Sequence, residues 1–182
     1  TDPTKTMTFT YNEFRRETVA VNERGYTRRF FFDGHGNPVT IEEENGGRRQ
    51  YTYDPAAPMN RTSKTDPLGY VTGYSYDGNG NVTRITLPSG SPIDYSYFTA
   101  FNQPGAIKDA RGHYTLLKYD AQGNLLQEIT LRAGLGAGIT PATYTPTPAD
   151  VVAWTIHTYD SHGNRLTTKQ VRDAATQAGP SV

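Results

Sequence analysis

Two aspartate and histidine pairs are the side chains of this sequence whose types and spacing could do chemistry. Asp33 stands two residues before His35, and Asp160 stands two residues before His162. A carboxylate beside an imidazole can bind a cation or exchange a proton near neutral pH. Two related segments carry asparagine or glutamine at the histidine position, as a solvated turn permits. We therefore favour a structural interpretation and predict no catalytic residue, no metal site and no cofactor.

A calcium-binding loop is a second candidate, because the segment from Asp77 to Val82 begins with the alternating Asp and Asn residues of such loops. An EF-hand loop also needs glycine at its sixth position and a bidentate glutamate at its twelfth. These positions hold Val82 and Pro88. The EF-hand hypothesis fails, and only a weak ion site built from turn carbonyls and aspartates stays open.

The composition argues against several other classes of protein. Lysine plus arginine and aspartate plus glutamate number 18 each, so no long-range field favours a nucleic acid or a membrane surface. The chain has no cysteine, which removes disulfides and thiol catalysis. No apolar run approaches the ~20 residues that span a bilayer, and the serines show no pattern of an activated nucleophile. We predict neither a nucleic-acid partner, nor a membrane span, nor an enzyme.

Arginine pairs occur at Arg15-Arg16, Arg28-Arg29 and Arg48-Arg49, interleaved with aromatic residues. Glutamates directly precede the third pair, at positions 42–44. Ion pairing between neighbouring strands and protection of sheet edges explain these arginines more simply than a nucleic-acid surface does.

The elements that would position all these side chains follow from an internal repeat. An aromatic residue recurs at intervals of 21 to 23 residues, with a last interval of 40 that is close to two units. Its positions are Tyr11, Phe32, Tyr53, Tyr76, Tyr97, Tyr119 and Tyr159. An aspartate follows directly in most copies, namely Asp33, Asp54, Asp77, Asp120 and Asp160. Such periods indicate stacked repeats, so we expect one repeat array over residues 1–182.

Two glycine positions keep the same phase as the aromatic residue. One lies four residues after it and precedes an asparagine, at Gly36-Asn37, Gly80-Asn81, Gly123-Asn124 and Gly163-Asn164. The other lies six or seven residues before the next aromatic residue, at Gly25, Gly47, Gly69, Gly90 and Gly112. Glycine and asparagine tolerate positive φ, and aspartate accepts hydrogen bonds from the backbone two residues later. Two tight turns in about 21 residues predict one β-hairpin per unit.

Strong and degenerate turns alternate along the chain. The units that begin at Tyr11, Tyr53 and Tyr97 lack the glycine at the fourth position. On this pattern, residues 131–156 hold a degenerate unit near Tyr144. The glycine and proline content of the same stretch is equally typical of a long loop. A degenerate repeat and an extended loop therefore both stay open for these residues.

These motifs resemble the tyrosine-aspartate repeats of the Rhs, or YD-repeat, proteins. The resemblance rests on Phe32-Asp-Gly-His-Gly-Asn37, Tyr76-Asp-Gly-Asn-Gly-Asn-Val82, Tyr119-Asp-Ala-Gln-Gly-Asn-Leu125 and Tyr159-Asp-Ser-His-Gly-Asn164. The segments Asp66-Pro-Leu-Gly-Tyr70 and Asp109-Ala-Arg-Gly-His-Tyr114 are similar to the second half of the repeat. The resemblance covers about residues 11–170, and it is specific because the motif returns in phase at least four times.

The resemblance implies an all-β fold in which antiparallel hairpins form a continuous curled sheet, part of a spiral shell. In bacterial Rhs effectors and insecticidal Tc toxins, such a shell encloses a toxic polypeptide. The implied partners are the rest of a parent shell and an enclosed polypeptide, and the implied location is secreted or at the bacterial cell surface. We find no copy of the conserved motif with the self-cleaving acidic residues, so that activity is not implied.

Two alternatives to a shell wall stay open. Exposed tyrosines could stack on sugar rings, which would make the chain a carbohydrate-binding or adhesion module, although recurrence at one phase favours a scaffold. An enzyme whose site is not visible in the sequence is the other. The chain starts Thr1-Asp2-Pro3, and we expect it to be a piece of a longer protein. Hairpins are marginal alone, so the unpaired sheet edges of this piece are expected to self-associate.

Overall fold

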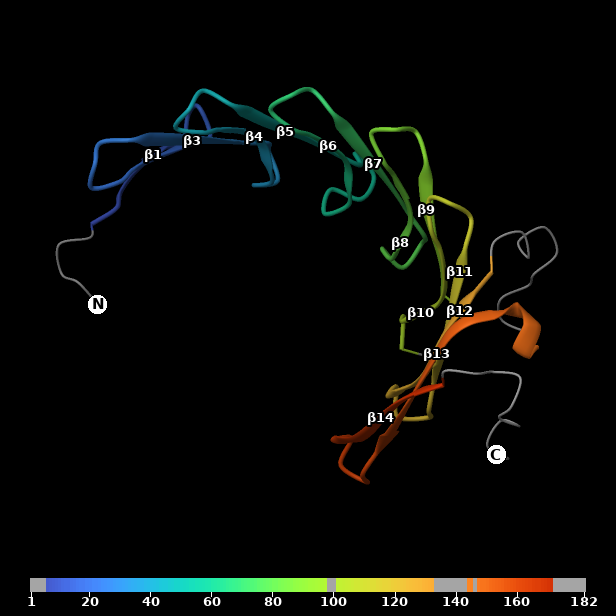
Figure 1. The fold of residues 1–182 in the computed structure, drawn as a ribbon. Helices are drawn as coiled ribbons and strands as arrows, with labels where there is room; N and C mark the ends of the chain where they lie inside the picture. Colours follow the sequence, from blue (N-terminus) through green and yellow to red (C-terminus); the bar gives the residue numbers. More distant parts are fainter. Residues whose placement is uncertain (1–5, 98–100, 133–143, 146, 172–182) are drawn as a thin grey trace. The chain divides into compact units, whose positions relative to one another are not determined.

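The structure of the protein is a computed structural model that describes residues 6–97, 101–132, 144–145 and 147–171. Fourteen β-strands account for most of these residues, and their order in the sheet is their order in the sequence (Figure 1). Neighbouring strands pair antiparallel within each of the two compact parts of the chain that are described below. Apart from one 3-10 turn, η2 (Pro148–Asp150), the described residues contain no helix. The predicted all-β fold of antiparallel hairpins is therefore confirmed.

The chain divides into two compact units, the first of which comprises residues 1–80 and 85–90. Its strands are β1 (Thr8–Asn12), β2 (Glu17–Val21), β3 (Thr27–Phe32), β4 (Pro38–Glu42), β5 (Arg48–Tyr53), β6 (Arg61–Thr65) and β7 (Val71–Tyr76). Strand β8 (Val82–Thr86) is divided between the two units. Few side chains of the first unit are fully buried; Ala20 and Glu17 on β2 are examples.

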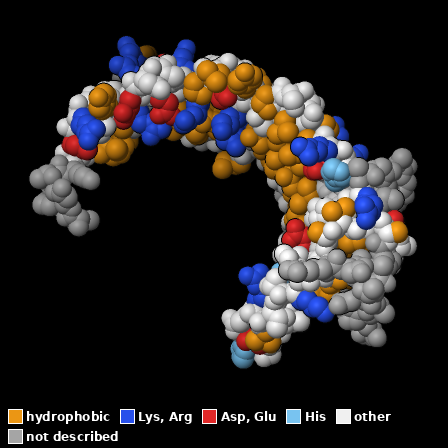
Figure 2. Space-filling model, viewed as in Figure 1, with side chains coloured by type: hydrophobic (Ala, Val, Ile, Leu, Met, Phe, Trp, Pro, Cys, Tyr) orange, Lys and Arg blue, Asp and Glu red, His pale blue; other side chains and the backbone are white. Residues whose placement is uncertain are grey.

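The strands of the first unit present two chemically different faces, because side chains alternate along a strand. We call one of them the aromatic face. It carries Phe30, Ile41, Arg49, Tyr51, Arg61, Lys64 and Tyr74, as the strand registers and ring contacts show. The opposite face carries hydroxyl groups, and the Thr52 hydroxyl lies 2.7 Å from those of Thr62 and Ser63. Charged and hydrophobic side chains are interspersed along this unit (Figure 2).

The second unit comprises residues 81–84 and 91–182 and holds the main hydrophobic core. Its strands are β9 (Pro92–Tyr97), β10 (Pro104–Lys108), β11 (Tyr114–Tyr119), β12 (Leu125–Leu131), β13 (Val151–Tyr159) and β14 (Arg165–Val171). Ala106 lies opposite Leu116, Leu116 opposite Ile129, and Ile129 opposite Trp154. These residues form one row across four strands, and Tyr144 packs against the core to which they belong.

The turns are built around residues with positive φ, as the glycine pattern predicts for most of them. Gly36, in the turn between β3 and β4, has a φ of 85°. Gly112, in the turn between β10 and β11, has a φ of 88°. One position differs from the prediction, because Gly46 and not Gly47 has positive φ. The two glycines are adjacent, so either satisfies the spacing. In two degenerate turns, Arg16 and Asn102 have positive φ in place of glycine.

The stretch 131–156 includes the end of one strand and the start of another, and these two strands pair directly with each other. Strand β12 ends at Leu131 and strand β13 begins at Val151, with Leu131 opposite Val151 after a register shift. Residues 133–143 and 146 lie outside the described part of the chain. The choice between a degenerate repeat and an extended loop therefore stays a prediction, as does a single array over residues 1–182. In the described segments, no helix has the length and apolarity that a transmembrane span requires.

Candidate functional site: the tyrosine and turn ladder

The repeated aspartate uses its carboxylate to close the turn that follows it. Asp33 Oδ1 accepts hydrogen bonds from the backbone N–H groups of His35 (2.8 Å) and Asn37 (2.9 Å). Its Oδ2 accepts a third from the Asn37 side chain at 3.0 Å. The backbone N–H of Gly36 donates to the Asp33 carbonyl, so Gly36 completes a three-residue hairpin loop with positive φ.

The same arrangement returns in the second unit. Asp120 accepts from the backbone N–H groups of Gln122 (2.9 Å) and Asn124 (2.8 Å), and from the Asn124 side chain at 2.8 Å. Asp160 accepts equivalent bonds from His162 and Asn164, all at 2.9 Å. The variable histidine or glutamine contributes its backbone N–H to the carboxylate. The other predicted aspartates, Asp54 and Asp77, accept backbone N–H bonds at 2.8 and 2.9 Å.

These carboxylates are engaged by their own turns and do not gather into a metal centre. Among the residues described, no group of three histidine, aspartate or glutamate side chains could hold a metal ion. The predicted residues are instead distributed as separate turns along the sheet, at Asp33, Asp54, Asp77, Asp120 and Asp160. Gly69 and Gly112 lie in the turns at the opposite ends of the hairpins, after Asp66 and Asp109.

The hydrogen bonds within the turns favour the ionised form of each aspartate. The Asn124 side chain contributes most to lowering the pKa of Asp120, and the Asn164 side chain does so for Asp160. Partial desolvation raises the pKa of Asp33, but hydrogen bonds from Asn37 and His35 outweigh it, and the net shift is downward. A donor that binds the carboxylate stabilises its charged form.

Acid should therefore weaken the turns. A folded pKa below the unfolded value contributes stability above the unfolded pKa, about 4 for aspartate, and the contribution is lost as pH falls through the folded pKa. We expect the melting temperature to fall between about pH 4 and pH 2. The paired variant Asp120→Asn with Asp160→Asn should show a flatter pH profile. Glu23→Gln removes a carboxylate outside these turns as the control, and a profile flattened equally by both changes would contradict the assignment.

Four tyrosine hydroxyls of the motif each link a hairpin to the one before it. Tyr53 donates to the Pro38 carbonyl at 3.1 Å, and Tyr76 donates to the Arg61 carbonyl at 2.8 Å. In the second unit the same bonds join Tyr119 to Pro104 (3.1 Å) and Tyr159 to Leu125 (3.0 Å). Each acceptor is the first residue of the second strand of the preceding hairpin. Four joints between hairpins therefore each carry one such side-chain bond, and we call this set of bonds the tyrosine ladder.

The tyrosine of the motif also marks a change of strand register. Register shifts fall directly before Phe32, Tyr53, Tyr119 and Tyr159. A β-bulge bends the strand and redirects its side chains. Burial raises the pKa of the Tyr53 and Tyr119 hydroxyls, so both remain protonated donors at neutral pH.

Tyr119→Phe should lower the free energy of unfolding by about 0.5 to 1.5 kcal/mol, because it removes one hydrogen bond and leaves a carbonyl without its donor. Tyr70→Phe is the matched control, because Tyr70 lies in a turn and its side chain is 56% exposed. Urea unfolding compares the two, and equal losses would show that the hydroxyl bond contributes nothing. Conversely, Phe32→Tyr places a hydroxyl 15 residues after Glu17, the spacing of the Tyr53 bond, and should be stabilising.

Neighbouring turns also contact each other across about 21 residues. The Asn37 side chain donates to the Pro58 carbonyl at 2.8 Å, and the Gln103 side chain donates to the Gly123 carbonyl at 3.0 Å. A Cβ atom on Gly123 would lie 3.0 Å from the Phe101 ring. Degenerate turns therefore pack on strong ones, which gives their alternation a structural meaning that sequence reasoning missed.

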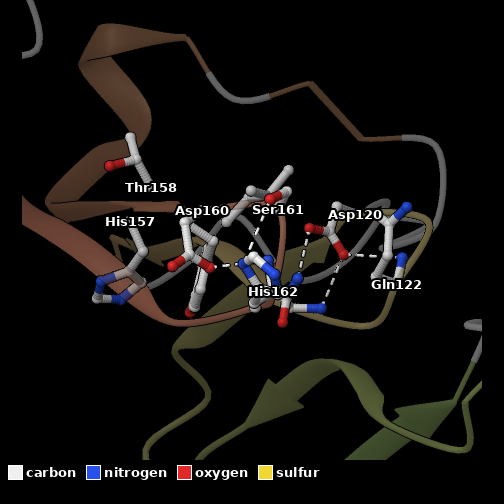
Figure 3. Close-up of a pocket in the computed structure, with 11 residues that line it drawn as sticks. Asp120, Gln122, His157, Thr158, Asp160, Ser161 and His162 are labelled. Carbon is white, nitrogen blue, oxygen red and sulfur yellow. Dashed lines mark hydrogen bonds between the residues drawn. The ribbon is translucent and has the colours of Figure 1, made fainter.

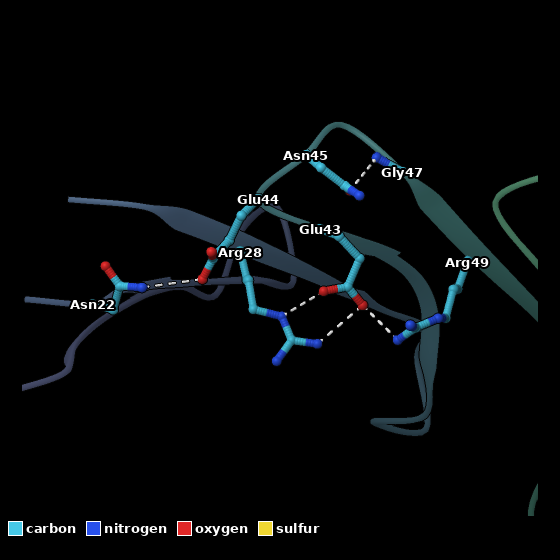
Figure 4. A network of polar contacts seen from close by, with 7 residues as sticks. All are labelled: Asn22, Arg28, Glu43, Glu44, Asn45, Gly47 and Arg49. Carbon is cyan, nitrogen blue, oxygen red and sulfur yellow. Dashed lines mark hydrogen bonds and ion pairs between the residues drawn. The ribbon is translucent and has the colours of Figure 1, made fainter. Parts of the chain in front are cut away.

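The arginine pairs on strands β3 and β5 form ion pairs between strands, as predicted. On the aromatic face, Glu43 accepts from both Arg28 and Arg49 (Figure 4). On the opposite face, Arg29 pairs with Glu17 at 3.4 Å and Arg48 pairs with Glu42 at 3.3 Å. These four arginines have acidic partners within the same sheet. No ion pair involves Arg15 or Arg16 among the residues that the structure describes.

A polar groove of about 660 Å³ lies in the second unit, between the turns of Asp120 and Asp160 (Figure 3). Gln122, Ser161 and His162 line it together with these turns. One tyrosine lines the groove, Tyr159, and its hydroxyl is already bonded to the Leu125 carbonyl. A surface on which sugar rings stack needs several exposed aromatic rings, and this groove offers only one.

Periodic hairpins joined by repeated side-chain bonds define a β-hairpin repeat protein. The family model described as RHS Repeat matches residues 60–92 and 76–114. Residues 60–114 are therefore similar to RHS repeats, and the resemblance inferred from the tyrosine-aspartate motifs is confirmed. No curated protein matches the sequence of this chain significantly.

Several solved structures share the fold. The crystal structure of TcdB2-TccC3-Cdc42 aligns with 97% of this chain at a TM-score of 0.67 and 16% identity. That of TcdB2-TccC3-TEV aligns with 84% at 0.58 and 16%. A Photorhabdus luminescens Tc holotoxin pore carrying a TccC3 mutation aligns with 79% at 0.57 and 20% identity. This chain spans only 10%, 8% and 7% of those longer chains, so the fold that it shares is that of a small part of each.

Proposed function

We propose that this chain is a non-catalytic wall segment of an Rhs-type shell that encloses a toxin or effector polypeptide in a secreted bacterial protein. The observation that carries the proposal is the bond from four of the motif tyrosines to the preceding hairpin, as in Tyr53 to Pro38 and Tyr119 to Pro104. Such bonds fasten hairpins in a row, which is the requirement for a wall. The RHS-repeat match and the fold shared with TcdB2-TccC3 structures support the same role.

Protection from proteolysis tests enclosure. In a longer protein that contains this chain, an enclosed polypeptide should resist a protease under native conditions and be cut once the shell is unfolded. The same polypeptide produced alone is the control. Equal cleavage rates for the free and the shell-linked polypeptide would overturn the proposal.

Self-association through sheet edges is a further consequence that we propose for the isolated chain. Strands β1 and β14 are the outermost strands of the described sheet, and the side chains of β1 are all exposed. Unpaired strand edges favour pairing with another chain. Sedimentation should therefore show an association that depends on concentration and weakens when Phe9→Lys and Thr10→Lys are introduced on β1. Monomeric behaviour of the unchanged chain at all concentrations would contradict it.

A further inference from the structure

Arg61 on the aromatic face is held between two tyrosine rings from the strands on either side. Its Cζ atom lies 5.4 Å from the centre of the Tyr51 ring on β5 and 5.1 Å from that of Tyr74 on β7. Lys64 lies on the same strand and face, opposite Tyr51. Stacking on aromatic rings uses the flat faces of a guanidinium and restricts its motion.

The described part of the first unit supplies no carboxylate to these two cations. Four arginines on β3 and β5 each pair with a glutamate, whereas neither Arg61 nor Lys64 forms an ion pair with any residue in the described ranges. In addition, the Arg61 Nε atom is buried without a hydrogen-bond partner. Buried donors are normally satisfied, so the fold does not complete the hydrogen bonding of this one atom. Arg61 as a whole is only partly buried, so a ligand on this face can still meet the rest of its guanidinium.

The chemistry of the missing partner follows from the geometry. A stacked guanidinium keeps the N–H groups on its edge, and this planar fork matches a carboxylate with two parallel hydrogen bonds. Because the rings already order the side chain, binding costs less conformational entropy than it does for a free arginine. Lys64 adds a second positive charge on the same face, which suits a ligand with more than one carboxylate.

We propose that Arg61 and Lys64, framed by Tyr51 and Tyr74, form a docking surface for an acidic segment of polypeptide. A nucleic acid fits less well, because the chain has equal numbers of acidic and basic residues and phosphate binding depends on many cations acting together. The proposal rests on the wall function above and deepens it by assigning the aromatic face as the face that meets the enclosed chain. Enclosure without binding at this surface would overturn only the present proposal.

Fluorescence anisotropy of the 182-residue chain tests the surface with a labelled peptide of alternating glutamate and serine. We expect binding that weakens with salt and is absent when glutamine replaces each glutamate. Arg61→Met should weaken binding at least about fivefold, and Arg61→Lys should restore only part of it because lysine lacks the fork. Lys64→Met should have a smaller effect in the same direction.

Arg48→Met is the matched control, because it removes the same charge from the opposite face. It should change the affinity less than about twofold, as expected for an exposed charge. Equal losses for Arg48→Met and Arg61→Met, or equal binding of the glutamine peptide, would overturn the proposal. Tighter binding of a single-stranded oligonucleotide than of the acidic peptide would overturn it as well.

A direct measurement avoids dependence on the folding of the Arg61 variants. In the unchanged chain, the Nε–H resonance of Arg61 should shift on addition of the acidic peptide, while that of Arg48 should not. A peptide that binds without moving the Arg61 resonance would place the contact elsewhere and contradict the assignment.

Discussion

Gly123→Val should lower the free energy of unfolding by about 2 to 4 kcal/mol, one of the two largest losses that we expect in this chain. Gly123 has a φ of 85°, which a β-branched residue adopts only with strain. A Cβ atom there would also lie 3.0 Å from the Phe101 ring, so the ring must leave the turn on which it packs. Urea unfolding followed by circular dichroism measures the combined loss.

Gly112→Val separates the two contributions. Gly112 has nearly the same φ, 88°, but nothing lies within 4 Å of the position of its Cβ atom. Gly112→Val should therefore lower the free energy of unfolding by the backbone strain alone, about 1 to 3 kcal/mol, without the loss of packing between turns. Removing the ring with Phe101→Ala should bring the effects of the two valine substitutions together. If the two valine substitutions already cause equal stability losses while Phe101 is present, the contact between turns contributes nothing.

The hairpins were predictable from the sequence because their signals are local. An aspartate, a glycine and an asparagine within five residues contain all the groups that close the turn of Asp33, Asp120 or Asp160. The turn of Gly46 shows the limit of such reasoning, because two adjacent glycines fit the spacing and only backbone geometry selects one of them.

The bonds between hairpins could not be read from residue types. The acceptor of the Tyr53 hydroxyl is the main-chain carbonyl of Pro38, and a carbonyl has no sequence signal. An offset of 15 residues from a motif tyrosine to a strand start, shared by Tyr53, Tyr76 and Tyr119, is the signal that could have found it. Tyr159 departs from it, because its acceptor Leu125 lies 34 residues earlier. The partners of Arg61 are equally hidden, because Tyr51 and Tyr74 reach it only after three strands are placed side by side.

The hydrophobic core of the second unit was also not identified from the sequence. Its buried apolar residues lie one or two per strand and opposite each other, as Leu116 and Ile129 do, so no single segment looks strongly hydrophobic. The core becomes visible only when the register of β10 to β13 is known. Tyr144, expected in a degenerate unit, packs against this core and donates to Asp150 at 2.7 Å.

Ile129→Ala should cost about 2 to 5 kcal/mol, because Ile129 is only 1% exposed and its truncation leaves a cavity among packed side chains. Ile129→Val should cost about 0.5 to 1.5 kcal/mol by the same reasoning. Ile41→Ala is the control in the first unit, where Ile41 is half-buried on the aromatic face and its removal leaves a surface that water can fill. The loss of unfolding free energy for Ile41→Ala should be clearly smaller than that for Ile129→Ala.

Hydrogen exchange locates the damage. Because Ile129 lies in the second unit, Ile129→Ala should accelerate amide exchange in β11, β12 and β13 much more than in β3, β4 and β5. This difference follows if stability is built unit by unit from contacts between neighbouring strands, as in other repeat arrays. Uniform acceleration throughout the described strands would instead mean that the chain unfolds as one cooperative body, and the core of the second unit would then stabilise every hairpin in the sheet.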